Sequence, residues 1–363
     1  MAGTDHDVSI MSVKVVSDDW LDTTVSSSLA SKYEITVKPS DEEVVDSNHS
    51  EYSIPTIDIS LLTSGDLHQR SKILHDLRKA CKEWGFFQLA NHGISDSVMK
   101  KLMEACESFF SMTEEEKIEF QGSTDVMEPI NYGTNFDCNA MGSSKYFIWR
   151  AFIKMLVHPQ FHSPYKPQGF SEAVEEYCER TREISTVLMR AISETLGLEA
   201  NCLEKATNWD EGLHLLASNY YPPCPDPDQA LGLLPHTDSG LINFIFQNDV
   251  GGLQILHKGK YVRWKAMPNT IIVDLGDHMQ ILSNDLYKSV THRAVVNNKN
   301  TRISIVSGHG PAADNKVAPI PELLEALGQA PAYPGIPYKE YLKLRRSPQS
   351  VLKATLDIIR LKQ

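Results

Sequence analysis

Residues 241–264 read LINFIFQNDVGGLQILHKGKYVRW, three short runs of β-branched and aromatic residues separated by turn residues. The pairs Gly251-Gly252 and Lys258-Gly259 supply the turns between the runs. Runs of the same kind occur nearby at 213–221, 270–275 and 302–306. Six short strands this close together predict a β-sandwich or β-barrel such as a jelly roll.

The sequence before these strands has a different periodicity. Three segments place apolar residues every three or four positions and predict amphipathic helices: 67–83, 95–110 and 171–196. Short strands are expected at 54–58 and 84–88. Residues 121–168 are irregular, aromatic and rich in Gly and Pro, so we expect a long functional loop there. Two short helices near 338–345 and 350–361 end the chain, and the fold class is therefore mainly β with flanking helices.

The composition permits a packed globular protein, such as an enzyme, and argues against several kinds of partner. The chain has 363 residues, 41% of them hydrophobic, which is enough to bury a large core. It carries 47 acidic against 35 basic residues and a formal charge of −12, so nucleic acid and anionic membrane would be repelled. Nothing in the sequence demands an assembly, and we expect a monomer.

The cysteines and the first residues indicate a cytoplasmic protein. The six cysteines are scattered singly without a C-x-x-C pair, which is typical of reduced thiols. No apolar run reaches the length of a transmembrane helix, and the first 30 residues lack the pattern of a signal peptide. Acidic residues early in the chain argue against a transit peptide.

The segment Pro235-His-Thr-Asp-Ser-Gly240 carries the first candidate metal ligands. His236 and Asp238 are two positions apart, so on an extended backbone both side chains lie on the same face. Chance alone produces some H-x-D pairs in a chain with 13 histidines and 47 carboxylates, so a surface pair is the alternative. Ser289-Val-Thr-His-Arg-Ala294 then supplies His292 in the same strand-rich half. Two imidazoles and one carboxylate suit iron(II) with three positions left open for substrates and O₂.

The segment Arg302-Ile-Ser304 predicts a site for a carboxylate. On a strand the guanidinium and the hydroxyl lie side by side, and they face inward if Ile303 faces the outer layer. Arginine presents a fixed planar set of donors that matches a carboxylate. Asn219 and Tyr221 have the same spacing, and either could contact the same ligand. The alternative for Arg302 is a surface ion pair, although an unpaired buried arginine would be costly.

These motifs resemble those of the plant soluble 2-oxoglutarate/Fe(II)-dependent dioxygenases, which include flavonol synthase, anthocyanidin synthase and gibberellin oxidases. The matching segments are Asn219-Tyr-Tyr-Pro-Pro-Cys-Pro225, Pro235-His-Thr-Asp238, Val250-Gly-Gly-Leu-Gln254, Gly276-Asp277, Leu282-Ser-Asn284, His292-Arg-Ala-Val295 and Arg302-Ile-Ser304. Upstream, Ile54-Pro-Thr-Ile-Asp58 and Trp84-Gly-Phe-Phe-Gln-Leu-Ala-Asn-His-Gly93 are similar to the family's amino-terminal region. The resemblance extends from residue 54 to the end of the chain.

The resemblance implies a double-stranded β-helix (jelly-roll) core in which His236, Asp238 and His292 ligate iron. The cosubstrate 2-oxoglutarate would chelate the metal, and its far carboxylate would meet Arg302 and Ser304, with Tyr221 and Asn219 nearby. O₂ would convert it to succinate and CO₂ while the main substrate is oxidised. Ascorbate is expected as the reductant.

The same resemblance divides the chain into four parts. Residues 1–53 are a partly ordered amino-terminal arm, rich in Ser, Asp, Glu and Val. Residues 54–200 form an amino-terminal α/β region, and residues 201–312 form the jelly-roll core that carries iron and 2-oxoglutarate. Residues 313–363 form helices that close the pocket.

The main substrate is expected to be a small specialised metabolite held by aromatic residues. Phe136, Phe147 and Phe244 are candidates for the pocket wall, although ordinary core packing is an equal alternative for each. His309 either lines the pocket or packs within its loop. Gly308 stands where several relatives carry an aromatic residue, which predicts a roomier pocket. Ala217 stands where a basic residue is common, which argues against flavonoid-type contacts.

Three functions fit the sequence. The first is a 2-oxoglutarate-dependent oxygenase that hydroxylates its substrate, with desaturation and O-demethylation as variants. The second is an oxidase of the same fold that does not consume 2-oxoglutarate; ethylene-forming relatives keep a pair similar to Arg302 and Ser304. The third is a binding or sensing protein on an inactive scaffold. The complete set of three ligands argues against the third, since a protein without iron chemistry has no physical need for them.

Overall fold

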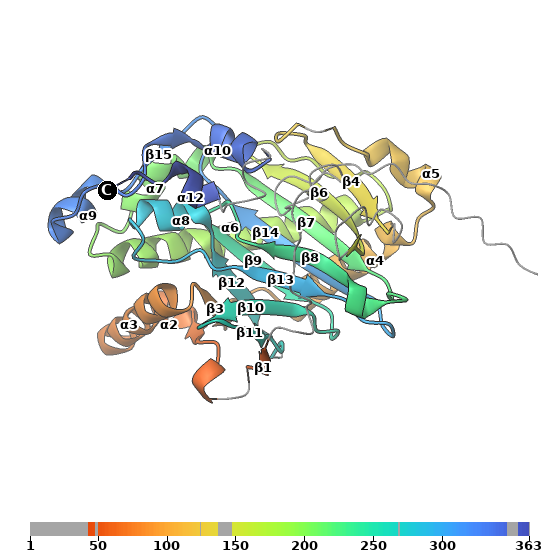
Figure 1. Ribbon diagram of the computed structural model, residues 1–363, viewed down its shortest axis with the longest axis horizontal. Coiled ribbons are helices and arrows are strands. Elements are labelled where there is room, and N and C mark those ends of the chain that lie inside the picture. Colours follow the sequence, from red (N-terminus) through yellow and green to blue (C-terminus); the bar gives the residue numbers. More distant parts are fainter. Residues whose placement is uncertain are drawn as a thin grey trace, which may run out of the picture.

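The computed structural model describes residues 43–47, 50–123, 125–136, 147–267, 269–346 and 355–362. Two β-sheets form the centre of the molecule, and helices surround them (Figure 1). The strand orders are β2-β3-β12-β9-β14-β7-β6-β4 in the major sheet and β1-β11-β10-β13-β8-β5 in the minor sheet. Among the described strands no pairing joins one sheet to the other, so the arrangement is a jelly roll of two sheets rather than a closed barrel.

The strands have these bounds. The major sheet contains β2 (Thr56–Asp58), β3 (Phe86–Ala90), β12 (Ile271–Leu275), β9 (Ile242–Gln247), β14 (Arg302–His309), β7 (His214–Tyr221), β6 (Arg150–His158) and β4 (Ile130–Asn135). The minor sheet contains β1 (Val44–Asp46), β11 (Lys260–Arg263), β10 (Leu253–His257), β13 (His292–Val295), β8 (Ala230–His236) and β5 (Phe147–Ile148). A small separate ladder pairs β15 (Lys316–Val317) with β16 (Ile336–Pro337).

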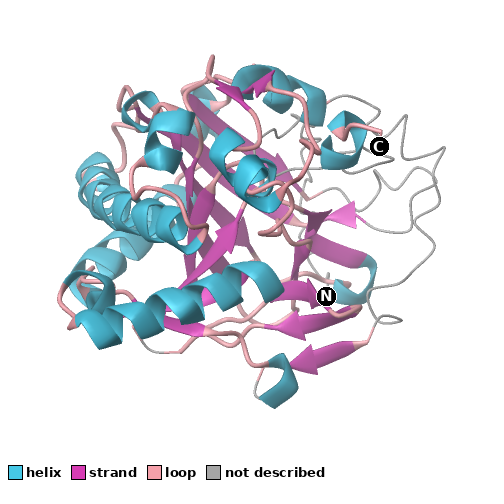
Figure 2. Cartoon of the chain, turned by 90° about the vertical axis from the view of Figure 1, so that its left-hand side faces the viewer, coloured by secondary structure: helices cyan, strands magenta, loops and turns pink. Residues whose placement is uncertain are grey.

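The helices of the described chain are mostly amphipathic. They are α2 (Ser60–Thr63), α3 (Leu67–Glu83), α4 (Asp96–Phe110), α5 (Glu114–Lys117), α6 (Phe170–Thr195), α7 (Cys202–Thr207), α8 (Asp277–Leu282), α9 (Pro321–Leu327), α10 (Tyr338–Arg345) and α12 (Thr355–Ile359). The long helices α3 and α4 both pack against α6. Figure 2 shows long helices along the outside of the sheets. None of the helices that the structure describes is long and apolar enough to cross a membrane.

The alternation of side chains in β14 separates two hydrophobic cores. Ile303 and Ile305 belong to the larger core, which the helices complete. Val306 belongs to a second core between the sheets, together with Tyr221 and Leu233. Because neighbouring side chains in a strand point to opposite faces, Arg302 and Ser304 share the inner face with Val306. Because Ile303 and Ile305 face the helices, Arg302 and Ser304 face inward, as predicted.

Helix α6 fixes the outer face of the major sheet. Thr181 Oγ1 lies 3.0 Å from Ser307 Oγ, a hydrogen bond from the helix to β14. Most of the helix's apolar stripe is fully buried in the larger core, including Tyr177 and Leu188. Helix α6 therefore covers the outer face of the major sheet, and the inner face is the one that faces the second core between the sheets.

The prediction of a long irregular loop over residues 121–168 is wrong. The structure places β4, β5 and β6 within that range, and β6 pairs with both β4 and β7. Strand β6 is buried along almost its whole length, so it lacks the alternation of polar and apolar residues that signals a half-exposed strand. Arg150 and Lys154 interrupt its apolar run although both side chains are buried.

Two strands that carry functional residues were absent from the predicted set. These are β8 and β13, which pair with each other in the minor sheet. Strand β13 has only four residues and β8 contains Gly and Pro, so neither has a strong local strand signal. The predicted helices 67–83, 95–110 and 171–196 agree with α3, α4 and α6 within one residue at either end. Most of the predicted amino-terminal arm and the start of the predicted helix 350–361 lie outside the described residues.

Candidate active site

The three candidate metal ligands converge between the sheets. His236 ends β8 and pairs directly across the ladder with His292, which begins β13. Asp238 follows two residues after His236. One ligand atom from each of the three side chains lies within 4.8 Å of the others, and all three residues are buried. His236 Nε2 is 3.5 Å and His292 Nε2 is 3.9 Å from Asp238 Oδ1.

Backbone contacts orient both imidazoles toward this centre. His236 Nδ1 lies 2.7 Å from the carbonyl of Leu234, and His292 Nδ1 lies 3.2 Å from the carbonyl of Val290. An Nδ1–H that donates to a carbonyl leaves the Nε2 lone pair free for a metal. Burial, with His236 close by, lowers the pKa of His292 to about 4. This imidazole is therefore neutral at neutral pH, as a metal ligand must be.

Asp238 provides the negative charge of the centre. Its side chain is 2% exposed, and burial alone would raise its pKa. The imidazoles of His236 and His292, whose Nε2 atoms lie 3.5 and 3.9 Å from Asp238 Oδ1, outweigh burial and hold the pKa of Asp238 below its ordinary value. Both carboxylate oxygens and His236 Nε2 lack a hydrogen-bond partner within the described part of the chain. Such atoms are costly to bury unless a ligand satisfies them, and a divalent cation fits this donor set.

Arg302 and Ser304, together called the arginine fork, lie at the other end of the space between the sheets. Arg302 is 2% exposed, and its Nε and Nη2 donate to Gln247 Oε1 at 3.0 and 2.8 Å. Its guanidinium stacks on the Tyr221 ring, 4.8 Å from the centroid. Nη1 is buried and has no partner among the described residues. Burial lowers the pKa of Arg302, but a guanidinium stays charged, so Nη1 can meet an anion.

Two glycines of the minor sheet make room for this fork. A Cβ at Gly252 would lie 2.9 Å from Arg302 Cδ, and a Cβ at Gly232 would lie 2.5 Å from the Tyr221 ring. Gly252 also has a φ of 151°, which side chains rarely adopt. The absence of a side chain at Gly252 and Gly232 therefore lets this part of the chain lie directly against Arg302 and Tyr221.

The remaining predicted residues of the fork are close by. Ser304 pairs in register with Asn219 across the ladder between β14 and β7. Asn219 is buried, and its Oδ1 accepts a hydrogen bond of 3.0 Å from Arg150. The amide oxygen of Asn219 thus already has a partner in β6, a strand that sequence reasoning had missed.

A second layer of contacts fixes the loop that carries Asp238. The backbone N–H of Asp277 donates to the Asp238 carbonyl at 2.7 Å. Asp277 Oδ2 accepts from Tyr341 at 2.6 Å and from Arg345 at 3.0 Å, and Arg345 also donates to the Thr237 carbonyl at 2.7 Å. The carboxy-terminal helix α10 therefore reaches the metal motif. Of Asp277, Tyr341 and Arg345, the sequence analysis singled out Asp277 alone, within the segment Gly276-Asp277.

The placement of Phe244 and His309 in the pocket needs correction. Phe244 lies in the larger core on the helix side of the major sheet. His309 stacks on His214 at 4.0 Å and lies 5.8 Å from the Trp209 ring. Both residues follow the outward register of Ser307, which bonds to α6, so strand alternation directs them away from the metal motif.

Phe136 and Phe147 belong to an aromatic cluster with Trp149. Their ring centroids lie 5.1 and 6.0 Å from the Trp149 ring, and the Trp149 indole donates to the Pro222 carbonyl. Phe147 is buried with Cys224 and Ala230, whereas Phe136 is partly exposed. The cluster borders the strand that carries Tyr221, and a role for either phenylalanine in substrate binding stays a prediction.

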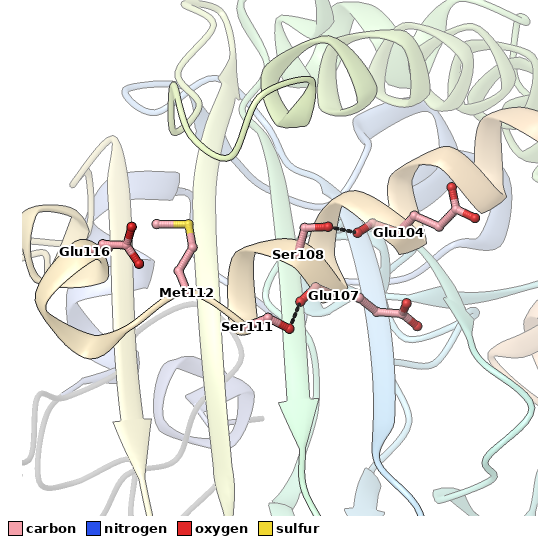
Figure 3. A pocket seen from close by; sticks show the side chains of 6 residues that line it. All are labelled: Glu104, Glu107, Ser108, Ser111, Met112 and Glu116. Carbon is pink, nitrogen blue, oxygen red and sulfur yellow. Dashed lines mark hydrogen bonds between the residues drawn. The ribbon is translucent and has the colours of Figure 1, made fainter.

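Another hollow lies on the surface of α4 and has no comparable chemistry (Figure 3). Its carboxylates, from Glu104, Glu107 and Glu116, are exposed. The hydroxyls of Ser108 and Ser111 are already bonded to the carbonyls of Glu104 and Glu107, each at 2.8 Å. The polar groups of this helix surface are exposed to water, whereas those of the metal motif are buried and lack hydrogen-bond partners among the described residues.

A jelly roll that encloses two histidines and one carboxylate defines a class, the non-haem metal oxygenases with a facial set of ligands. Family models agree with this class. The 2OG-Fe(II) oxygenase superfamily model matches residues 212–311, and the model "non-haem dioxygenase in morphine synthesis N-terminal" matches residues 54–175.

Known proteins resemble the chain over most of its length. It is 39% identical to 2-oxoglutarate-dependent dioxygenase 19 of Oryza sativa subsp. japonica, over 85% of this chain and 90% of that protein. It is 37% identical to flavonol synthase/flavanone 3-hydroxylase of Petunia hybrida, over 82% of this chain and 84% of that protein. The crystal structure of JOX2 with 2OG, Fe and JA superposes with a TM-score of 0.75 at 28% identity and covers 95% of this chain and 100% of that one.

This chain belongs to the 2OG-Fe(II) oxygenase superfamily. It is an enzyme, a dioxygenase with iron(II) as cofactor and 2-oxoglutarate as cosubstrate, and it acts on a small molecule. The predictions of family, reaction class, cofactors and mainly β jelly-roll fold are confirmed.

Proposed function

We propose that His236, Asp238 and His292 hold the iron and that the enzyme hydroxylates a small specialised metabolite. The observation that carries the assignment of ligands is the convergence of three buried side chains whose free atoms lie within 4.8 Å of one another. When bound, iron and 2-oxoglutarate reduce O₂, giving succinate, CO₂ and one oxygen atom for the substrate.

Arg302, Ser304 and Tyr221 hold the far carboxylate of 2-oxoglutarate in this proposal. A divalent cation with Asp238 carries a net charge of +1, and Arg302 adds another, so a dianion between them is neutralised. The unpartnered Nη1 of Arg302 is the atom that donates to that carboxylate. Asn219, held by Arg150, limits how far the cosubstrate can shift along β7.

Apolar residues between the sheets keep water away from the centre. Val306, Ala217 and Leu233 are buried together on the inner faces of both sheets. A dry site strengthens the interaction of Arg302 with the cosubstrate and protects reactive species from side reactions. We also propose that the enzyme acts as a monomer in the cytoplasm and that ascorbate restores iron(II).

The test is stoichiometric succinate release. The chain is reconstituted without oxygen with iron(II) and then given 2-oxoglutarate, O₂, ascorbate and a panel of plant metabolites. The proposal predicts that a true substrate stimulates succinate formation and yields one hydroxylated product per succinate. Product without succinate would indicate an oxidase that does not consume 2-oxoglutarate. A desaturated or demethylated product at the same stoichiometry would replace hydroxylation but retain the proposed site.

A further inference from the structure

Gln247 is the last residue of β9 and lies directly beside the arginine fork. It pairs in register with Ser304 across the ladder between β9 and β14. Residues opposite each other in a ladder point to the same face, so Gln247 shares the inner face with the fork. The packing of its neighbours agrees, because Phe246 belongs to the larger core and Ile245 to the core between the sheets.

The amide oxygen of Gln247 holds one edge of the Arg302 guanidinium. Gln247 Oε1 accepts hydrogen bonds from Nε at 3.0 Å and from Nη2 at 2.8 Å. A guanidinium can only donate, so the oxygen of the amide must face it rather than the nitrogen. These bonds leave the edge formed by Nη1 and the second N–H of Nη2. Two parallel N–H groups on one edge are the geometry that binds a carboxylate through both of its oxygens.

Two further contacts limit how the Arg302 side chain can move. The Tyr221 ring lies under the guanidinium, 4.8 Å from its centroid. A Cβ at Gly252 would lie 2.9 Å from Arg302 Cδ and 3.1 Å from Nε, so the backbone of Gly252 packs against the side chain. The ring opposes tilting of the guanidinium, and the oxygen of Gln247 opposes its rotation within its own plane.

The next residue, Asn248, anchors the end of β9 to β14. Its backbone N–H donates to the Ile303 carbonyl at 3.1 Å, and its Oδ1 accepts from the Ile303 N–H at 3.2 Å. Its Nδ2 donates to the Thr301 carbonyl at 3.0 Å. These contacts fall on the two residues that flank Arg302. The backbone of Gln247 is therefore held at a fixed place relative to the arginine that its side chain contacts.

Gln247 is uncharged, so it orients Arg302 without neutralising it. A glutamate would offer a similar acceptor oxygen. Its carboxylate, however, would form an ion pair with the guanidinium and would cancel the charge that attracts a second carboxylate. Glutamine supplies the hydrogen bonds alone, and the positive charge of Arg302 stays available to a ligand.

We propose that Gln247 is a positioning residue for the cosubstrate. Its amide oxygen holds Arg302 so that the edge with Nη1 faces the far carboxylate of 2-oxoglutarate, and its neutrality leaves the charge of Arg302 to that carboxylate. Gln247 thereby makes the site selective for a 2-oxoacid with two carboxylates over one with a single carboxylate. This inference rests on the proposed function, in which Arg302 binds the far carboxylate.

The test measures affinities in the absence of turnover. The iron-loaded chain is titrated calorimetrically without oxygen, with 2-oxoglutarate and with 2-oxopentanoate, in which a methyl group replaces the far carboxylate. Gln247→Met should weaken 2-oxoglutarate binding by about tenfold, because Arg302 keeps its charge but loses its orientation. Gln247→Glu should weaken it by about 100-fold, because the new carboxylate occupies the guanidinium. The affinity for 2-oxopentanoate should change by less than about twofold in both variants.

The chain offers a matched control in the minor sheet. Gln254 of β10 is buried, and its Oε1 accepts a hydrogen bond from Arg293 Nε at 2.8 Å. Because neighbouring side chains in a strand point to opposite faces, Arg293 points away from the side of β13 that carries His292. Gln254→Glu makes the same change beside this second buried arginine. It should leave the affinity for 2-oxoglutarate within about twofold of the wild type.

The order of the two Gln247 variants decides the inference. A merely structural role predicts that Gln247→Glu binds 2-oxoglutarate more tightly than Gln247→Met, since glutamate keeps the acceptor oxygen that methionine lacks. Affinity in Gln247→Glu equal to or higher than that in Gln247→Met would therefore overturn the inference. Loss of bound iron or of the fold in either variant would overturn it too, because Gln247 would then act on the metal centre or on stability. Unchanged affinity in Arg302→Met would instead refute the proposed role of Arg302.

Discussion

The proposed site brings several buried atoms without hydrogen-bond partners close together. His236 Nε2, the Asp238 oxygens and Arg302 Nη1 lack partners among the described residues, although all of them are enclosed. Ordinary core polar groups such as Thr181 and His214 are bonded, in both cases to Ser307. A protein that leaves its strongest donors and acceptors unpaired gives up stability, which is a usual cost of a functional site.

Removing the arginine fork should affect the cosubstrate and not the metal. We predict that Arg302→Met weakens 2-oxoglutarate binding by about 100-fold, because a buried charge-assisted contact contributes about 2–3 kcal/mol. Calorimetric titration of the iron-loaded chain measures this affinity, and iron content should stay unchanged. Arg263→Met is the matched control, since within the described ranges the Arg263 side chain makes an exposed ion pair with Asp46 and no other. An equal affinity for 2-oxoglutarate in both variants would contradict the role of Arg302.

The spacing of residues in the sequence predicted which side chains meet at the metal motif. It did not predict, for every residue, the side of the sheet to which the side chain points. His236 and Asp238 were found from their i, i+2 spacing, and His292 from a motif far along the chain. Phe244 and His309 were misplaced because their outward register depends on where β9 and β14 pair, which no local pattern encodes. Gln247 and Arg345 were missed for the same reason, since each acts through a partner distant in sequence.

At the scale of elements, helix α10 acts as a brace for the loop that carries Asp238. Arg345 and Tyr341 both bond to Asp277, and Arg345 also bonds to the carbonyl of Thr237. Desolvation would lower the pKa of Arg345, but Asp277 and other nearby groups outweigh it and raise the pKa above its ordinary value. The brace is therefore a charged, fully engaged contact that sets the position of a proposed metal ligand.

Breaking this brace should weaken iron binding without touching a ligand. We predict that Arg345→Met lowers iron affinity by about 10- to 100-fold, as loss of groups that orient metal ligands usually does. The affinity is measured by anaerobic titration well below the Tm of the variant. Lys343→Met is the control on the same helix, because the one ion pair of Lys343 with a described residue is the exposed pair with Glu340. Equal iron affinities in the two variants would refute the bracing role.

The helices and strands were predicted correctly where apolar residues recur with a strong periodicity. The prediction failed where a strand is buried on both faces and therefore has no such periodicity. Helices α3, α4 and α6 have long amphipathic patterns, and their bounds were predicted to within one residue. Strand β6 is buried on both faces and was taken for a loop. The short strands β8 and β13 depend on pairing with each other, and only the tertiary structure reveals that pairing.

At the scale of the molecule, the carboxy-terminal segment is tied to the core through Asp285. This carboxylate accepts hydrogen bonds from Tyr333 at 2.6 Å, from Gln280 at 2.7 Å and from Arg360 at 3.1 Å. Burial would raise its pKa, but these contacts, with Arg360 the largest among them, lower the pKa of Asp285 to about 2. The segment after α12 thereby contributes to global stability.

This contact should make stability depend on acid pH. Because the folded pKa of about 2 lies below the ordinary value of 3.8, the stabilisation is complete above about pH 4 and is lost as pH falls toward 2. We predict that Asp285→Asn lowers the free energy of unfolding at pH 7 by about 1 kcal/mol and flattens its decline below pH 4. Denaturant titrations at several pH values measure both effects. The exposed Asp357→Asn is the control, and equal acid profiles in the two variants would contradict the prediction.

The division into four regions and the monomeric, cytoplasmic state remain predictions of the sequence. The mainly β fold followed from strand-like runs and turn residues, because those signals are local. Local signals did not predict how the fourteen described strands divide between the major and the minor sheet. Register and sheet membership are set by packing between distant segments.

The iron content of the reconstituted chain tests the proposed centre most directly. The wild type, His292→Ala and the exposed-residue control His68→Ala are each loaded with iron(II) without oxygen and freed of unbound metal. The proposed site predicts about one iron per chain in the wild type and in His68→Ala, and less than about a tenth of that in His292→Ala. Equal iron in His292→Ala and the wild type would contradict the proposed centre.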